Sequence, residues 1–334
     1  MRRKEEASAM KILESIPKIS LGCYPTPFYK MKNLSKKTGL NLFIKREDLS
    51  GLGLGGNKIR KLEYLLADAK QKKCDVIITT GAAQSNHAML TAAACRVLNL
   101  EPILVLKERG VTSLKGNLLL SKILDSEVHF VDTDDNEIVN AKIDLIMKQL
   151  EFRGKKPYFI PTGGSVPLGV LGYVSAVFEM FNQAEHDDVR IDHIVCATGS
   201  GGIQAGLIAG VELLDKSVKV TGINISSNKE LPKIVANLSN GAFGLLSSDK
   251  NITKEEIIVR NYVGEGYAIP SKEGTEAIKL VARSEGIMLD HVYTGKAFAG
   301  LLSLSEQGYF EKDENILFIH TGGVPALFAI DAKF

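Results

Sequence analysis

Residues 194–214, IVCATGSGGIQAGLIAGVELL, join an apolar run, a glycine-rich turn and a helical pattern in one short stretch. The β-branched run Ile194–Ala197 predicts a buried strand, and the residues from Ile203 onward predict a helix. The turn Thr198–Gly202 between them contains two hydroxyl side chains and three glycines. A strand that passes through such a turn into a helix is typical of a parallel α/β sheet.

The same strand–turn–helix pattern recurs along most of the chain. Further apolar runs predict strands at 42–45, 76–79, 103–106, 158–160, 218–223 and 316–319. Helical patterns fall at 60–71, 86–98, 114–124, 137–150, 169–181, 203–214, 272–285 and 296–304. Because the strands are continuously apolar and alternate with helices, we expect an α/β fold with parallel sheets that are covered on both faces.

Ligands of such sheets bind beyond the carboxyl ends of the strands, where loops lead into helices. Most of the small, polar, glycine-rich turns of this chain stand at these points. They are Gly51–Lys58, Gly81–His87, Pro161–Ser165, Thr198–Gly202 and His320–Gly323. The sequence therefore predicts a site that is assembled from several strand ends.

The turn Thr198–Gly202 is the first candidate for ligand binding. Its backbone N–H groups, its hydroxyls and the N-terminus of the following helix can hold a phosphate. A tight turn that needs glycine for a positive φ is the simpler alternative. A dinucleotide is disfavoured, because Gln204 stands at the third glycine position of the fingerprint and the next strand ends in Ser226–Asn228 without an acid.

Lys58 is the second candidate, because it follows a glycine-rich loop and precedes a predicted helix. A partly desolvated lysine has a lowered pKa and can form a Schiff base with an aldehyde. The alternative is an exposed lysine in a basic first turn with Arg60 and Lys61. The loop Gly51–Gly56 favours the first interpretation, since an exposed lysine needs no such loop. A Walker A loop is disfavoured, because neither Ser nor Thr follows Lys58.

Gln84–His87 places four hydrogen-bonding side chains in succession at a predicted helix start. N–H groups and the helix dipole can hold a carboxylate there. Capping by Ser85 or Asn86 is the alternative, although a cap requires only one such residue.

Tyr267 and Tyr293 stand beside glycines, and each can stack on a heteroaromatic ring or exchange protons, with core packing as the alternative.

The composition of the 334 residues is that of an ordinary globular protein, although 31 glycines are a slight excess. The length predicts about two domains, and 41 basic against 39 acidic side chains give no footprint for nucleic acid or a membrane surface. The chain has no secretory signal pattern and no apolar run of about 18 residues that would span a membrane. Its 4 scattered cysteines suit reduced thiols in the cytoplasm, and neither they nor its 6 histidines show metal-ligand spacing.

Several of these segments together resemble one known family. They are Lys45–Asp48, Gly55–Glu63, Gln84–His87, Thr198–Gly202, Asp290–Lys296 and His320–Gly323. Their residues and their order are similar to those of the 1-aminocyclopropane-1-carboxylate deaminase and D-cysteine desulfhydrase family. The resemblance starts at Tyr24 and runs almost to the C-terminus, so that only the N-terminal segment lies outside it.

The resemblance implies a pyridoxal-phosphate enzyme with the tryptophan-synthase-β-like fold, which is fold type II. Its two open twisted-sheet domains hold pyridoxal 5'-phosphate between them. Residues 1–60 and 170–334 are expected to form the large cofactor-binding domain, and residues 61–169 an inserted small α/β domain. We also expect a homodimer that acts on a small amino acid.

The resemblance assigns roles to single residues as well. It implies catalytic roles for Lys58, Ser85, Tyr267 and Tyr293, with Lys58 bound covalently to the cofactor. Cofactor contacts are implied for Asn86, Thr198, Gly199, Ser200, Gly201, Gly202, Tyr293 and Thr321. Substrate contacts are implied for Ser85, Asn86, His87 and Tyr267.

Three positions discriminate within the family. The cyclopropane deaminases carry Glu, Leu and Gln where this chain has Thr294, Thr321 and His87. A carboxylate beside the pyridine nitrogen keeps it protonated and makes the ring a strong electron sink. Threonine offers only a hydrogen bond, and the weaker sink suffices when a good leaving group departs from Cβ.

The resemblance therefore predicts the α,β-elimination of D-cysteine to pyruvate, hydrogen sulfide and ammonia, with Lys58 removing the Cα proton. Three alternatives stay open. Two are enzymes of the same kind, a 1-aminocyclopropane-1-carboxylate deaminase and an L-cysteate sulfo-lyase. The third is a non-catalytic protein that binds a phosphate ligand or an amino acid.

Overall fold

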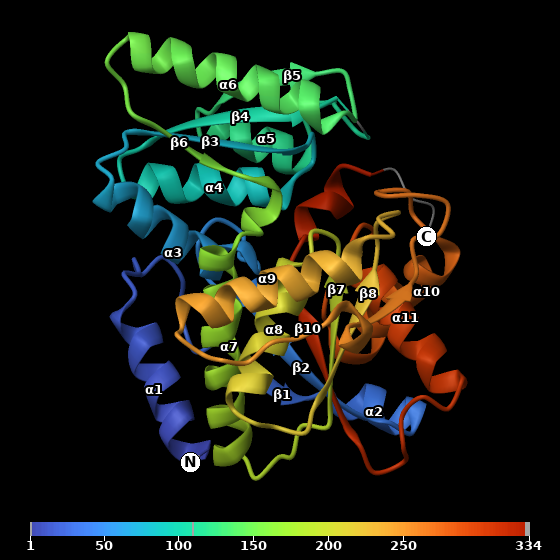
Figure 1. Cartoon of the computed structure of the whole chain (residues 1–334). Helices are drawn as coiled ribbons and strands as arrows, with labels where there is room; N and C mark the ends of the chain where they lie inside the picture. The colour runs from blue at the N-terminus through green and yellow to red at the C-terminus, as the bar shows by residue number, and fades with distance from the viewer. Residues whose placement is uncertain (1, 109, 331–334) are drawn as a thin grey trace.

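The structure, a computed structural model, describes residues 2–108 and 110–330. The strands of these residues form one sheet of six strands and one of four. Figure 1 shows the four-stranded sheet and its helices at the top of the molecule, with the six-stranded sheet below. The predicted α/β architecture is confirmed. No helix in the described part of the chain is both long and apolar enough to cross a bilayer.

The larger sheet has the strand order β1-β2-β10-β7-β8-β9. Its strands are β1 (Phe28–Lys30), β2 (Asn41–Arg46), β7 (His193–Thr198), β8 (Lys219–Asn224), β9 (Ile258–Asn261) and β10 (Asn315–His320). All neighbours are parallel except β1, which pairs with β2 in the antiparallel sense. Because β10 lies between β2 and β7, segments from both ends of the chain build this sheet.

The smaller sheet has the strand order β5-β4-β3-β6, and all its neighbours are parallel. Its strands are β3 (Val76–Ala82), β4 (Glu101–Lys107), β5 (Glu127–Val131) and β6 (Pro157–Ile160). This sheet is therefore built from one continuous stretch of sequence. That stretch lies inside residues 61–169, although the boundaries of the inserted domain stay a prediction.

Helices connect the strands and cover the sheets. They are α1 (Arg2–Ser15), α2 (Lys32–Thr38), α3 (Lys58–Gln71), α4 (Asn86–Val97), α5 (Gly116–Ile123), α6 (Asn136–Phe152), α7 (Pro167–His186), α8 (Gly202–Leu213), α9 (Leu231–Leu245), α10 (Lys272–Glu285) and α11 (Thr294–Glu306). Helices α7 and α8 approach closely because glycines face the contact. A Cβ on Gly206 would lie 2.4 Å from that of Tyr173, and one on Gly210 would lie 2.6 Å from that of Val177.

The central strands of the larger sheet are buried on both faces. Ile194 and Cys196 pack into one apolar core, whereas Val195 and Ala197 pack into the core on the opposite face. Successive side chains of a strand point to opposite faces, so a continuously apolar strand needs cover on both. This arrangement confirms the burial predicted from the apolar run, and it places the polar turn after β7 at the sheet edge where ligands bind.

Candidate active site

A cavity of about 460 Å³ lies at the carboxyl ends of strands from both sheets. Its lining residues end or follow strands β3 to β10 in the chain, or stand at the starts of α3, α4, α6, α8 and α11. The cavity is thus built from strand ends, as expected for a parallel α/β fold.

Most of the predicted site residues line this one cavity. They are Lys58, Ser85, Asn86, His87, Thr198, Gly199, Ser200, Gly201, Tyr267, Tyr293 and Thr321. Gly202 and Thr294 are buried but do not line it. Of the two threonines that were predicted to discriminate between substrates, Thr321 therefore faces the cavity and Thr294 lies behind its wall.

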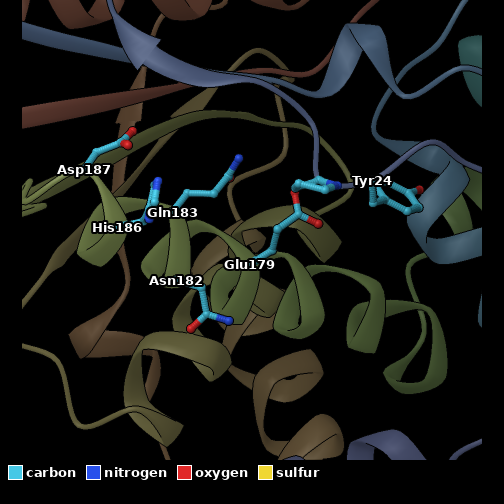
Figure 2. Close-up of a pocket in the computed structure, with 7 residues that line it drawn as sticks. Tyr24, Glu179, Asn182, Gln183, His186 and Asp187 are labelled. Atoms are coloured by element: carbon cyan, nitrogen blue, oxygen red, sulfur yellow. The ribbon is translucent and has the colours of Figure 1, made fainter.

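A larger cavity, of about 670 Å³, lies elsewhere on the molecule. Figure 2 shows Glu179, Asn182, Gln183 and His186 projecting from α7, with Tyr24 on a separate segment. The Glu179 carboxylate at this cavity forms an ion pair with Arg60, so its charge is already compensated. Because it contains none of the predicted site residues, we take the smaller cavity as the candidate active site.

Lys58 begins helix α3 and has the properties of a reactive amine. The hydrogen bond of its Nζ goes to Asn57 Oδ1, at 3.1 Å. Burial lowers the pKa of Lys58 to about 8. The preceding loop passes close to neighbouring backbone, since a Cβ on Gly55 would lie 1.8 Å from the Asp48 carbonyl oxygen. The glycine-rich loop therefore lets Lys58 reach the cavity, as the sequence predicted.

The turn after β7 is suited to an anion. Gly201 has a φ of +81°, a conformation that favours glycine, and the following residue begins α8. Thr198 Oγ1 is buried without a hydrogen-bond partner. Ser200 Oγ lies 2.8 Å from Ser165 Oγ. The glycine requirement is therefore confirmed at Gly201, and ligand binding by this turn stays a prediction, which the unpartnered hydroxyl of Thr198 favours.

A second buried lysine, which the sequence analysis did not select, stands behind this turn. Lys61 Nζ donates to the Gly163 carbonyl and to Ser165 Oγ, both at 3.1 Å, and burial, followed by the charge of Lys58, lowers the pKa of Lys61 well below its usual range. A Cβ on Gly202 would lie 2.4 Å from Lys61 Nζ, so the ammonium abuts the start of α8. Lys61 lies one helical turn after Lys58, and that spacing is the signal that could have found it.

The start of α4 combines capping with a place in the cavity wall. Ser85 Oγ accepts a hydrogen bond from the Ala88 N–H at 3.2 Å, so Ser85 is the N-cap. Asn86 Oδ1 accepts from Asn117 Nδ2 at 2.6 Å. The capping alternative is thus correct for Ser85, but its hydroxyl hydrogen stays available to a ligand at the helix N-terminus.

His87 is buried and neutral. Its Nδ1 atom, which has no hydrogen-bond partner in the described residues, can accept a hydrogen bond but cannot donate one. Thr79 Oγ1 lies 2.8 Å from the Ile160 carbonyl oxygen and 2.9 Å from His87 Nε2. Since the hydroxyl hydrogen goes to the carbonyl, Nε2 must carry a hydrogen and Nδ1 a lone pair. Burial, with further help from the charges of Lys58 and Lys61, holds the pKa of His87 well below its usual range. The lone pair on His87 Nδ1 would repel a substrate carboxylate rather than bind it.

The two predicted tyrosines meet at the cavity wall. Their hydroxyls are hydrogen bonded to each other, and both rings line the cavity. Tyr293 is the N-cap of α11. Burial, followed by the neighbouring Tyr267, raises the pKa of Tyr293, so its hydroxyl keeps its proton.

Thr294 gives its hydroxyl hydrogen to a buried carboxylate. Its Oγ1 donates to Asp290 Oδ1 at 2.6 Å and accepts from the Asp290 N–H at 2.7 Å. The Asp290 carboxylate also accepts from the backbone N–H groups of Val292, Tyr293 and Thr294. Burial raises the pKa of Asp290, and these hydrogen bonds act against that shift. Asp290 thus fixes the start of α11 and the orientation of the Thr294 hydroxyl.

The rim of the cavity includes residues that sequence reasoning missed. Lys107 is the last residue of β4, and its Nζ donates to the Asp134 carbonyl at 2.9 Å and to Asn136 Oδ1 at 2.8 Å. Ser226 and Asn228, after β8, also line the cavity. Among the described residues that line it, Asp134 is the only acidic one. Positions after strand ends were the available signal, but the residues themselves are common surface types.

Comparison with known proteins identifies the family of the chain. The family described as "Pyridoxal-phosphate dependent enzyme" matches residues 19–322. A protein of Pyrococcus furiosus, named "Putative 1-aminocyclopropane-1-carboxylate deaminase", is 44% identical over 318 residues, which are 95% of each chain. A D-cysteine desulfhydrase of Klebsiella pneumoniae is 40% identical over 329 residues, which are 96% of this chain and 98% of that protein.

Solved structures with the same fold also exist. An ACC deaminase homologue has a TM-score of 0.89 at 42% identity, over 96% of both chains. The processed form of threonine deaminase isoform 2 from Solanum lycopersicum has a TM-score of 0.66 at 18% identity, over 96% of this chain and 85% of that one. At that identity the second likeness concerns the fold alone.

Proposed function

The chain belongs to the pyridoxal-phosphate dependent enzyme family, within its deaminase and desulfhydrase relatives, and from this membership we propose that it eliminates hydrogen sulfide from D-cysteine. Its fold is fold type II, as the sequence resemblance predicted. The observation that carries the choice of substrate is the wall behind Tyr293. Thr321 lines the cavity, and by the sequence resemblance Thr321 and Thr294 stand at positions where the cyclopropane deaminases carry Leu and Glu.

The residues of the cavity fit the cofactor of this family. Bound pyridoxal phosphate supplies an electron sink that stabilises negative charge at the Cα atom of an amino acid. Lys58 would hold its aldehyde carbon, because burial keeps a fraction of this amine neutral near pH 8. The turn Thr198–Gly202 would hold its phosphate, since Thr198 Oγ1 is unpartnered and the Lys61 ammonium stands behind the turn. Asn86 and Tyr293 would contact the ring.

Lys58 then acts as the base when its amine is free. It removes the Cα proton, the C–H electron pair forms the Cα=Cβ bond, and the Cβ–S pair departs with sulfide. Water hydrolyses the resulting enamine to pyruvate and ammonia. A base is most effective when its pKa lies near the operating pH, and the pKa of Lys58, which is lowered to about 8, meets that condition.

The remaining residues orient the substrate and move protons. We assign its carboxylate to the Ser85 hydroxyl and the N-terminus of α4 rather than to His87, whose free nitrogen is an acceptor. Tyr293 keeps its proton and is hydrogen bonded to Tyr267, so the pair can donate a proton to the departing sulfide. His87 and Tyr267 would face the substrate side chain.

Further features of the proposal concern the whole molecule. We propose that residues 61–169 form a small domain inserted into a large one made of residues 1–60 and 170–334. A homodimer and a cytoplasmic location are part of the same proposal. The buried thiols of Cys74, Cys95 and Cys196 suit a reducing compartment.

The proposed function is tested with a panel of substrates. Purified enzyme loaded with the cofactor is incubated with D-cysteine, L-cysteine, L-cysteate and 1-aminocyclopropane-1-carboxylate, and the keto acid and sulfide or sulfite are measured. We expect pyruvate and sulfide from D-cysteine at the highest kcat/KM. The double variant Thr294→Glu with Thr321→Leu should lower that value at least about tenfold, because a carboxylate beside the ring changes its electron demand.

The other outcomes distinguish the alternatives. Formation of 2-oxobutyrate from the cyclopropane substrate as the main activity would make the chain a deaminase, the activity in the name of its Pyrococcus furiosus relative. Sulfite from L-cysteate would indicate a sulfo-lyase. A preparation that binds no cofactor would favour a binding protein. An unchanged double variant would show that these two threonines do not select the substrate.

A further inference from the structure

Lys296 is a buried charge that the proposed reaction does not use. It is the third residue of α11, and its side chain is fully buried. Its Nζ donates to the Val263 carbonyl at 2.6 Å and to the Gly266 carbonyl at 2.8 Å. The hydrogen-bond acceptors of this ammonium are therefore backbone carbonyls of a loop.

The position is unfavourable for a cation. The N-terminus of a helix carries a partial positive charge, so a lysine in the first turn of α11 is repelled. Desolvation of an ammonium costs free energy, and burial lowers the pKa of Lys296 accordingly. An apolar side chain of the same length would fill the space without that cost. The charged group of Lys296 therefore does not stabilise helix α11. Its role is to bind the carbonyls of Val263 and Gly266.

The segment that it holds is irregular. Residues 262–271 link β9 to α10 without helix or strand. Gly264 has a φ of +67° and Ala268 a φ of +61°. The left-handed conformation costs a residue other than glycine roughly 1 kcal/mol. Without the ladder hydrogen bonds of regular structure, this segment needs other contacts to keep its shape, and Lys296 makes two of them.

The segment also carries a wall of the cavity. Gly266, whose carbonyl accepts from Lys296, directly precedes Tyr267. The Tyr267 hydroxyl is bonded to that of Tyr293, which is three residues before Lys296 at the start of the same helix. The beginning of α11 therefore holds two consecutive residues of the segment, one by its backbone and one by its side chain.

We propose that Lys296 is a positioning residue, which holds Tyr267 against the substrate cavity through the carbonyls of Val263 and Gly266. Its ammonium acts as a cross-link between α11 and the segment 262–271. Loss of this cross-link frees Tyr267 from Tyr293 and enlarges the substrate site. The effect on substrate binding rests on the proposed function, whereas the effect on the segment does not.

The first test measures the segment itself, in cofactor-free protein. Amide hydrogen exchange of residues 262–270 is compared between the native chain, Lys296→Met and Lys272→Met. Lys272 is an exposed lysine at the start of α10, next to the same segment, and serves as the matched control. We expect exchange at least tenfold faster in Lys296→Met and unchanged in Lys272→Met. Equal protection in a folded Lys296→Met protein would overturn the proposal.

A second variant guards against loss of folding. Lys296→Gln keeps a polar side chain with N–H donors, so we expect intermediate exchange of the segment and a melting temperature near that of the native chain. If Lys296→Met does not fold, Lys296→Gln decides the question. Native-like protection in Lys296→Gln together with normal exchange elsewhere would then contradict the proposal, because a shorter amide cannot reach both carbonyls.

The second test separates positioning from general support. Lys296→Met should raise KM for D-cysteine at least tenfold with a smaller change in kcat. In the Tyr267→Phe background the same substitution should add less than twofold, because its effect passes through the Tyr267 hydroxyl. Additive effects would overturn the proposal. If no variant, including the native chain, forms pyruvate from D-cysteine, the proposed function fails and the exchange experiment still decides the role of Lys296.

Discussion

Helix α3 carries three cations that are buried or partly buried, and two of them, Lys58 and Arg60, have opposite surroundings. Lys58 reaches into the cavity with an amide oxygen as its partner, and burial lowers its pKa to about 8. Arg60, two residues later, is 2% exposed and bonded to two carboxylates. Its guanidinium contacts Glu47 at 2.6 Å and Glu179 at 2.8 Å, and these charges hold its pKa above the usual range despite burial.

The difference separates a reactive buried charge from a structural one. A buried cation with counter-ions stays protonated and ties elements together, whereas burial without a carboxylate partner lowers the pKa of a lysine, as it does for Lys58 and Lys61. The Arg60 network joins Glu47 after β2, Glu179 of α7 and Lys45 of β2. The larger cavity borders this network, and the smaller one contains Lys58. The larger cavity thus borders paired charges, whereas the candidate site contains a lysine whose hydrogen-bond partner is an amide oxygen.

The substitution Lys58→Ala tests the difference between Lys58 and Arg60 most directly. We expect turnover to fall by at least about 10⁴-fold and the yellow colour of the lysine-bound cofactor to disappear. The thermal stability of the cofactor-free protein should be unchanged or higher, because a desolvated amine is removed. Absorption spectra, pyruvate assays and thermal unfolding measure these effects. Full activity in the variant would remove Lys58 from the mechanism.

The substitution Arg60→Met should lower the stability of the protein, whereas Lys58→Ala should not. Removal of Arg60 takes the cation from Glu47 and leaves Glu179 with Lys45 alone, and the expected loss is about 3–5 kcal/mol in the free energy of unfolding. The control is Lys72→Met at the other end of α3, where the exposed pair with Asp68 is worth roughly 0.5 kcal/mol or less. Denaturant unfolding of the cofactor-free proteins measures both. A loss below about 1 kcal/mol at Arg60 would show that the network is not structural.

The smallest predicted effect concerns the titration of Lys58. Burial disfavours the ammonium, so the amine loses its proton at lower pH and its reactivity rises with pH through about 8. An ordinary lysine does so near pH 10.4, which makes Lys58 roughly a hundredfold more neutral at pH 8. Labelling of cofactor-free protein with an amine reagent, followed by mass spectrometry, gives the midpoint. A midpoint near 10.4 would indicate that Lys58 is solvated in the absence of cofactor.

The fold could be predicted for every interior strand and for one edge strand, β6. All seven strands expected from apolar runs occur, whereas β1, β5 and β9 were missed. Each missed strand lies at the edge of its sheet. Edge strands are half exposed, so they need no continuous apolar run and leave no such signal. Helices α1, α2 and α9 were also missed. In α9, Gly241 and Gly244 lower the helix propensity of the sequence.

The site could be predicted where a backbone requirement or an unusual cluster of side chains marks it. Glycine turns and the row Gln84–His87 led to the cavity, because few structural roles need them. Lys61 was missed, since a lysine in a basic helical turn reads as an exposed one, and only tertiary packing buries it. The orientation of Thr294 toward Asp290 likewise depends on the tight turn before α11, which spacing does not reveal.

The place of β10 has a consequence for how the chain is made. Strand β2 ends at Arg46 and pairs with β10, which begins at Asn315. On a ribosome that adds about 5–20 residues per second, roughly 15–50 s pass between the synthesis of β2 and that of β10. The four-stranded sheet needs no such delay, because its strands follow one another within residues 76–160. We expect a nascent chain whose middle is folded while its first strands are still exposed, so that this interval is the period in which chaperones matter most.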